Sequence, residues 1–147
     1  MNKFWLDLTC DYKVANSYKY DSSYLLRVSG KNIGNFAFRK ALESLIADLH
    51  LYQTVNWKDA QDIQFTDDSE TIVSCANWLG MTENDEISNL CRAEVIEKIS
   101  GKCIIFGLGS QAAFGQDLSF GPNTTRLARA LASKTVILSV RDETTAQ

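Results

Sequence analysis

This sequence of 147 residues is short of proline, histidine and basic charge, and each shortage excludes a class of protein. One proline and eight glycines exclude collagen-like and proline-rich disordered chains. Fifteen Lys and Arg residues against 18 Asp and Glu residues leave a net charge of −3, which argues against nucleic acid as a partner because a polyanion requires a basic surface. With His50 as its single histidine, the chain gives little support to a Ser-His-Asp triad.

Long apolar runs are also missing. The longest are a few residues, such as Cys103-Ile104-Ile105-Phe106, and are too short to span a bilayer. Asp7 falls where a signal peptide needs an uninterrupted apolar stretch. We therefore expect a cytoplasmic protein with no transmembrane segment and no targeting signal.

The four cysteines, Cys10, Cys75, Cys91 and Cys103, contain no Cys-x-x-Cys pair. Zinc sites usually bring their ligands in close pairs, so this spacing does not favour a metal site. Cys75 and Cys103 sit in apolar, strand-like runs, and Cys91 falls on the apolar face of a predicted helix. We expect no metal ligation and read the cysteines as small, buried, reduced side chains.

What the sequence does contain is enough apolar material for one folded domain. Hydrophobic residues make up 45% of the chain and aromatic residues 10%, which argues against disorder. At roughly 150 residues per domain, residues 1–147 form a single domain. Residues 1–23 carry no clear pattern and are treated as an N-terminal extension of uncertain structure.

Short apolar runs alternate with longer amphipathic stretches. The runs predict strands at 24–28, 71–76, 103–107 and 136–140, and the polar segment 53–70 leaves room for a short strand. The stretches predict three helices, the first of which begins after Asn35 as N-cap. Their expected buried faces consist of Phe38, Leu42, Leu45, Ile46 and Leu49; of Ile87, Leu90, Cys91, Val95 and Ile99; and of Leu127, Ala128 and Leu131. Arg39, Lys40, Glu43 and Asp48 are expected away from the first of these faces.

Strands that alternate with helices predict an α/β fold with a Rossmann-like, mostly parallel sheet and helices on both faces. In such sheets, ligands bind beyond the carboxyl ends of the strands. The candidate substrate-binding residues are those that follow the predicted strands: Asn32, Gly34, Asn35, Asn77, Gly107, Gly109, Ser110, Gln111, Arg141 and Asp142. The pattern assigns no catalytic residue.

Two of these segments have more than one interpretation. Gly107-x-Gly109-x-x-Ala112 matches the letters of a dinucleotide fingerprint, but its strand comes late in the chain, no clear helix follows, and Asp142 lies too far on for the acidic residue. The glycines serve either a tight turn or the close approach of a ligand. Similarly, Arg141-Asp142 either starts a helix, with Asp142 at its positive end, or places Arg141 in the cleft.

Four segments in order carry a resemblance to a known family: Gly30 to Asn35 after the first predicted strand, the loop with Asn77, Ile-Ile-Phe-Gly-Leu-Gly-Ser-Gln at 104–111, and residues 131–145 with Arg141-Asp142 and Thr145. Together they resemble the polysaccharide pyruvyl transferase family over about residues 24–147. That family usually has a carboxylate where Asn35 stands and, in many members, a glycine run where Cys75-Ala76-Asn77-Trp78 stands.

The resemblance implies transfer of a pyruvyl group from phosphoenolpyruvate to a sugar of a cell-surface polysaccharide, in exopolysaccharide biosynthesis, with no further cofactor. It also implies a glycosyltransferase-B-like enzyme of two Rossmann-like halves, of which this chain is the N-terminal, acceptor-side half. Such a half is expected to be inactive alone and to self-associate through the face that meets its other half. The alternative is a non-catalytic Rossmann-like binding or interaction module.

Overall fold

A computed structural model describes residues 1–7, 33–55, 57–112 and 115–146. Within these residues, five strands form one sheet in the order β2-β1-β3-β4-β5, and every pair is parallel. The strands are β1 (Lys3–Leu6), β2 (Gln53–Val55), β3 (Glu70–Ser74), β4 (Lys102–Leu108) and β5 (Thr135–Val140). The chain therefore has an α/β fold with a parallel sheet.

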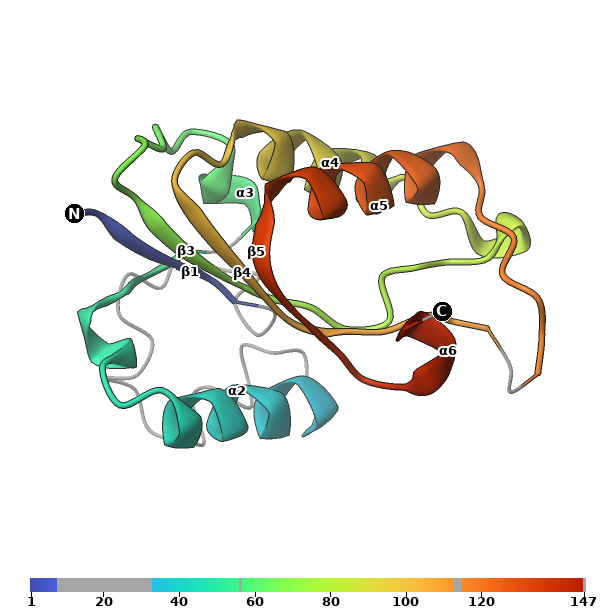
Figure 1. Ribbon diagram of the computed structural model, residues 1–147, viewed down its shortest axis with the longest axis horizontal. Coiled ribbons are helices and arrows are strands. Elements are labelled where there is room, and N and C mark those ends of the chain that lie inside the picture. The colour runs from blue at the N-terminus through green and yellow to red at the C-terminus, as the bar shows by residue number, and fades with distance from the viewer. Residues whose placement is uncertain (8–32, 56, 113–114, 147) are drawn as a thin grey trace.

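The helices cover both faces of this sheet (Figure 1). One face carries α2 (Ile33–Leu45) and the short α6 (Glu143–Ala146). The opposite face carries α3 (Trp57–Ala60), α4 (Ser88–Lys98) and α5 (Pro122–Lys134). Two 3-10 turns, Leu49–Leu51 and Thr82–Asn84, complete the described elements. No helix in the described part of the chain combines the length and the apolar character that a membrane crossing requires.

Three of the predicted strands are confirmed, and they pair as expected. The predictions at 71–76, 103–107 and 136–140 correspond to β3, β4 and β5, although β3 ends at Ser74. The predicted strand at 24–28 lies outside the described residues. The segment 53–70 holds β2 at its start. The N-terminal extension contains β1, which the sequence pattern missed because four residues are too few to show an alternation.

The sheet separates two apolar clusters. On the α4 and α5 side, Val73, Ile105 and Leu127 belong to one large buried cluster. On the α2 side, Trp5, Leu42 and Ile72 belong to a smaller one. Aligned registers explain the pattern, because Trp5 pairs with Ile72 and Ile72 with Ile104, so that these side chains share the α2 face.

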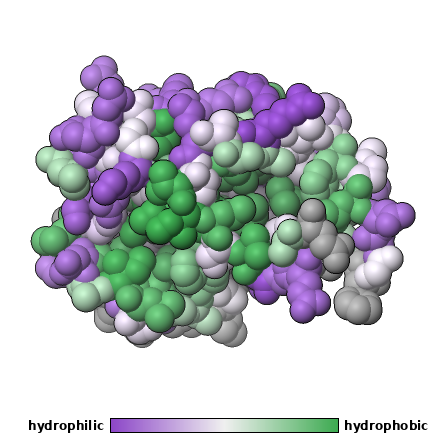
Figure 2. All heavy atoms as spheres, in the orientation of Figure 1, coloured by the Kyte–Doolittle hydropathy of each residue, from purple (hydrophilic) through white to green (hydrophobic). Residues whose placement is uncertain are grey.

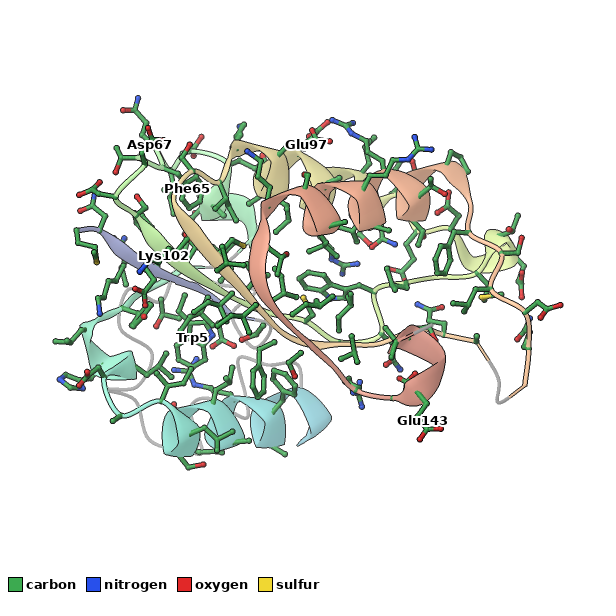
Figure 3. The ribbon with its side chains drawn as sticks, in the orientation of Figure 1. Trp5, Phe65, Asp67, Glu97, Lys102 and Glu143 are labelled. Atoms are coloured by element: carbon green, nitrogen blue, oxygen red, sulfur yellow. The ribbon has the colours of Figure 1, made fainter. Side chains whose placement is uncertain are left out.

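Arg39 corrects one sequence prediction. It was expected on the polar side of its helix, yet its side chain is fully buried on the sheet side of α2. It pairs with the buried carboxylate of Asp7 and with Glu43, and its guanidinium lies 4.5 Å from the centroid of the Trp5 ring. Figure 3 shows Trp5 pointing from β1 towards α2. Burial lowers the pKa of Arg39, and the carboxylate of Glu43 opposes this effect.

The buried stripe of α4 is also displaced from the predicted one. Asn89, Ala93, Val95, Ile96 and Ile99 are buried, whereas Ile87 and Cys91 are exposed. Asn89 takes a core position because its Nδ2 donates to the carbonyl of Trp78 (2.7 Å) and to Thr124 Oγ1 (3.0 Å). The prediction that Cys91 is buried is therefore wrong, while Cys75 and Cys103 are buried and free.

Replacing Arg39 by methionine tests the buried ion pair. Asp7 would lose its Arg39 partner while its carboxylate stays buried, so we expect Arg39→Met to lower the free energy of unfolding by about 3–5 kcal/mol in urea denaturation. The neighbouring Lys40 is a matched control, because its ion pair with Glu43 is exposed. Lys40→Met should cost no more than about 1 kcal/mol. Equal effects of the two substitutions would contradict the assigned role of Arg39.

Candidate functional site

The residues predicted to follow β3, β4 and β5 meet at the carboxyl edge of the sheet. Arg141 Nη1 donates to Asn77 Oδ1 at 2.8 Å, and Gln111 Nε2 donates to the carbonyl of Asn77 at 3.0 Å. Gln111 is 34 positions and Arg141 64 positions from Asn77 in the sequence. They meet because the carboxyl ends of parallel strands share one edge of the sheet. We call Asn77, Gly109, Ser110, Gln111, Arg141 and Asp142 the carboxyl-edge cluster.

Main-chain hydrogen bonds hold the loops of this cluster together. The loop after β4 runs beside the loop after β3: the amide of Gly109 donates to Ala76 (2.9 Å), the amide of Leu79 to Gly109 (3.1 Å), and the amide of Gln111 to Leu79 (3.0 Å). Ser110 and Leu79 form a parallel bridge beyond the ends of their strands. The cluster thus rests on a continuation of the sheet, which fixes the backbone of Gly109, Ser110 and Gln111.

The segment after β5 closes the other side of the cluster. The amide of Ser110 donates to Thr145 Oγ1 at 2.8 Å, and the amide of Arg141 donates to the carbonyl of Leu108 at 2.8 Å. Asp142 Oδ1 accepts from the amide (2.8 Å) and the hydroxyl (2.9 Å) of Thr145. Asp142 therefore accepts hydrogen bonds at the start of α6, as the helix-start interpretation of Arg141-Asp142 predicts. The exposed Arg141 instead reaches into the cluster, as the cleft interpretation predicts. In Figure 3, Glu143 of α6 points away from the strands.

Both glycines of the loop have a local structural role. Gly107 has a φ of 74°, and a Cβ there would lie 2.2 Å from the Phe38 ring. That ring packs edge-on against Phe106, with 5.4 Å between the centroids. A Cβ on Gly109 would lie 2.7 Å from Asn77 Oδ1 and 3.2 Å from Cδ of Arg141. Gly107 thus makes room for α2, and Gly109 allows Asn77 and Arg141 to meet.

The residues predicted after the first strand do not join the cluster in the same way. Asn32 lies outside the described residues. Gly34 is exposed in the first turn of α2, and Asn35 lies within the helix, which begins at Ile33, so the prediction of Asn35 as N-cap is wrong. The N-terminal end of α2 lies on the α6 side of the molecule (Figure 1), and Phe38 of this helix approaches Gly107, two residues before Gly109 of the cluster.

The sheet order also shifts the expected centre of the site. The apolar run Cys103-Ile104-Ile105-Phe106 favours a central place in the sheet for β4 and for the loop that follows it. However, β3 is the middle one of the five described strands, and β4 lies between β3 and β5, the last strand in this order. In the strand order, β2 lies on one side of β1, and β3, β4 and β5 follow on the other side. Parallel sheets open a crevice at such a switch point, which here lies between β1 and β3. Asn77, which follows β3, is therefore the cluster residue nearest to that point in strand order.

Sequence reasoning missed the charged neighbours of the cluster. Gln111 also bonds to Glu86, whose pKa is lowered mainly by the Ser88 hydroxyl and further by Arg92 and Gln111. Arg92 is half-buried over the ring of Trp78, at 4.9 Å, and donates to Asn89 Oδ1 at 2.7 Å. No motif spacing marks these residues, because Arg92 belongs to α4 and Glu86 to the segment before it, and neither directly follows a strand.

Asp85, the residue before Glu86, lies at the N-terminal end of α5. Its carboxylate accepts from the amides of Asn123 (2.9 Å) and Thr124 (2.7 Å) and from the Thr124 hydroxyl (2.8 Å). The residue before the helix is Gly121, which has no side chain to cap it. Asp85, 39 residues away from Thr124, therefore acts as the N-cap, and these hydrogen bonds lower its pKa despite an opposing desolvation.

Gly107→Ala tests the packing of the loop on α2. The control is Gly115→Ala, because Gly115 has a φ of 76° but nothing within 4 Å of a Cβ. Both variants meet backbone strain of about 1–2 kcal/mol, and only Gly107→Ala must also displace Phe38, at about 1–3 kcal/mol more. We expect urea denaturation to show the larger loss for Gly107→Ala. Equal losses would contradict a packing role for Gly107.

The lowered pKa of Asp85 predicts a pH dependence. Because the folded-state pKa lies below the unfolded value of about 3.9, the contribution of Asp85 is complete above that value and is lost as the pH falls through the folded pKa. We expect wild type to melt at a higher temperature than Asp85→Asn at pH 7, and the difference to shrink towards zero in strong acid. A difference that is constant from neutral to acid pH would contradict this assignment.

Comparison of the chain with models of protein families, with curated proteins and with solved structures finds no match. A parallel sheet with helices on both faces hosts many unrelated activities, so the fold by itself does not select one. What the chain does has to be argued from the carboxyl-edge cluster and from its exposed surfaces.

Proposed function

We propose that the carboxyl-edge cluster is the sugar-binding wall of a polysaccharide pyruvyl transferase. One observation carries the proposal: the segments that resemble this family, around Asn77, 104–111 and 131–145, are separated in the sequence and converge in a single hydrogen-bonded cluster.

The chemistry assigned to this reaction suits the polar character of the cluster. Phosphoenolpyruvate forms two C–O bonds at C2 with two sugar hydroxyls; its methylene carbon gains one hydroxyl proton, the C2–O bond to phosphate breaks, and phosphate leaves with the other proton. The acceptor side must orient a pair of hydroxyls. The exposed side chains of Asn77 and Arg141 present hydrogen-bond donors at this edge, next to Gln111.

The donor side makes a different demand. Phosphoenolpyruvate requires an anion site and a general acid for its methylene carbon. In the cluster, the carboxylate of Asp142 accepts two hydrogen bonds from Thr145, and Arg141 donates to Asn77. The proposal therefore assigns donor binding to a second Rossmann-like half in a glycosyltransferase-B-like arrangement, with this domain on the acceptor side, in cytoplasmic exopolysaccharide synthesis.

A second candidate is a non-catalytic binding or interaction module. It is favoured by the hydrogen bonds within the cluster itself. Gln111 donates to the carbonyl of Asn77, the amide of Ser110 donates to Thr145 Oγ1, and Gly107 and Gly109 allow close packing. In this view, the loop 107–111 is a structural turn. The two candidates differ in whether sugars bind at the cluster.

Sugar binding is tested by titrating the ¹⁵N-labelled chain with a panel of hexoses and N-acetylhexosamines. We expect amide shifts at Asn77, Gly109 to Gln111 and Arg141, and we expect Gln111→Ala to weaken binding about fivefold, the equivalent of one hydrogen bond of about 1 kcal/mol. The control, Gln64→Ala, changes an exposed glutamine in the loop before β3, away from the carboxyl edge. Both variants should fold normally, because Gln64 is exposed and Gln111 is only partly buried.

Two results would count against the proposal. If sugars cause no shifts at the cluster, or if Gln64→Ala weakens binding as much as Gln111→Ala, the interaction module is the better description. We also expect no phosphate release when this chain alone is mixed with phosphoenolpyruvate and the sugar that binds best. Turnover by the chain alone would contradict the division of the site between two halves.

A further inference from the structure

Strand β5 leaves a row of apolar side chains in solvent. Val136, Ile137 and Leu138 are 61%, 58% and 50% exposed, and they are consecutive, so both faces of the strand are uncovered. Among the described residues, β5 has a strand neighbour on one side only, which is β4. Figure 2 shows hydrophobic residues gathered in the middle of the view, over the region where Figure 1 places β4 and β5. Contiguous apolar surface of this kind marks an interaction site.

The partner that fits this edge is another strand. Soluble proteins guard their edge strands with lysine, glutamate, proline or a very short length. The six residues of β5, Thr-Val-Ile-Leu-Ser-Val, contain none of those residues. The outer edge of β5 thus offers main-chain amides and carbonyls together with apolar side chains on both faces. A helix would use the side chains alone, whereas an added strand uses the main chain as well.

The sequence of β5 is complementary to itself in the antiparallel direction. Leu138 shares the sheet face of Ile105, and Ile137 shares that of Ile104. If two β5 strands meet about a two-fold axis at Leu138, Leu138 faces Leu138, and Val136 faces Val140 at both ends. Ile137 then faces Ser139 on the other side of the sheet. Leu138 and Val140 lie opposite Ile105 and Leu108 of β4 and share one face, so they form an apolar row across the axis, of the kind that stabilises paired strands.

The charges at the two ends of β5 favour the same arrangement. Lys134 precedes the strand and Asp142 follows it. Antiparallel pairing about Leu138 brings the Lys134 end of one chain to the Asp142 end of the other, twice. Parallel pairing would place like charges beside each other. An unrelated strand offers no reason for this match, whereas a second copy of the chain supplies it by symmetry.

We propose that two copies of this chain associate through β5 and join their sheets into one continuous sheet with a two-fold axis at Leu138. The dimer buries the apolar row, completes the main-chain hydrogen bonds of β5, and brings Asp142 of each carboxyl-edge cluster to one end of the interface. The inference rests on β5 alone and does not depend on the proposed function.

Sedimentation equilibrium over a range of protein concentrations tests the association. We expect a dimer for the wild-type chain and a monomer for Ile137→Lys, which puts two charges close to the axis. The control is Ile87→Lys, because Ile87 is 78% exposed, lies before α4 and is more accessible than any residue of β5. It should remain a dimer. Circular dichroism should show the same fold for all three proteins.

A cysteine at the axis tests the register. In a chain with Cys10 and Cys91 changed to serine, Leu138→Cys should form a disulfide between two chains under mild oxidation. Val136→Cys should not, because it faces Val140 of the second copy. A wild-type monomer overturns the proposal, as does an Ile137→Lys dimer. Equal loss of the dimer in both lysine variants, or crosslinking of Val136→Cys in preference to Leu138→Cys, overturns it as well.

Discussion

Parallel pairing of β3 with both β1 and β4 is the constraint on which the rest of this structure depends. Its register places Trp5, Ile72 and Ile104 in one row across the α2 face, and the same row gives α2 a surface to cover. Because all five strands run the same way, every carboxyl end lies at one edge. Asn77, Gln111 and Arg141 meet there although long stretches of chain separate them.

Each helical layer is held by a buried polar contact in addition to apolar packing. On one face, Arg39 joins α2 to Asp7 at the end of β1. On the other, Asn89 joins α4 to the loop after β3 and to Thr124 of α5. Such contacts are worth little as net stabilisation compared with apolar side chains of the same size, but a wrong arrangement would leave a charge or an amide buried without its partner. They therefore restrict how the helices can sit on the sheet.

The same logic describes the carboxyl edge. Its loops extend the β3–β4 pairing by main-chain hydrogen bonds, so the side chains that remain at the surface stand on a rigid support. In the proposed function, this rigid surface orients a polyhydroxyl ligand through hydrogen bonds, in which neutral side chains such as Asn77 and the charged Arg141 both take part. The structure thus separates two properties: a polar edge at the ends of the strands, and an apolar edge along β5.

The sequence by itself determined the α/β class, the strands β3, β4 and β5, and the residues at their carboxyl ends. These follow from local properties: β-branched, apolar runs form buried strands wherever they occur, and glycine or polar residues end them. Even the meeting of Asn77, Gln111 and Arg141 was predictable, because parallel strands leave no other place for their ends.

The tertiary structure alone decided the rest. Arg39 belongs to the core because Asp7 and Trp5 come from a strand far away in the sequence, and Cys91 is exposed because Asn89 has buried partners on α5 and after β3. Asp85 caps a helix that begins 37 residues later, which no capping pattern can show. Helical periodicity predicts which apolar side chains are buried. The burial of a polar side chain depends on hydrogen-bond partners that only the folded chain brings within reach.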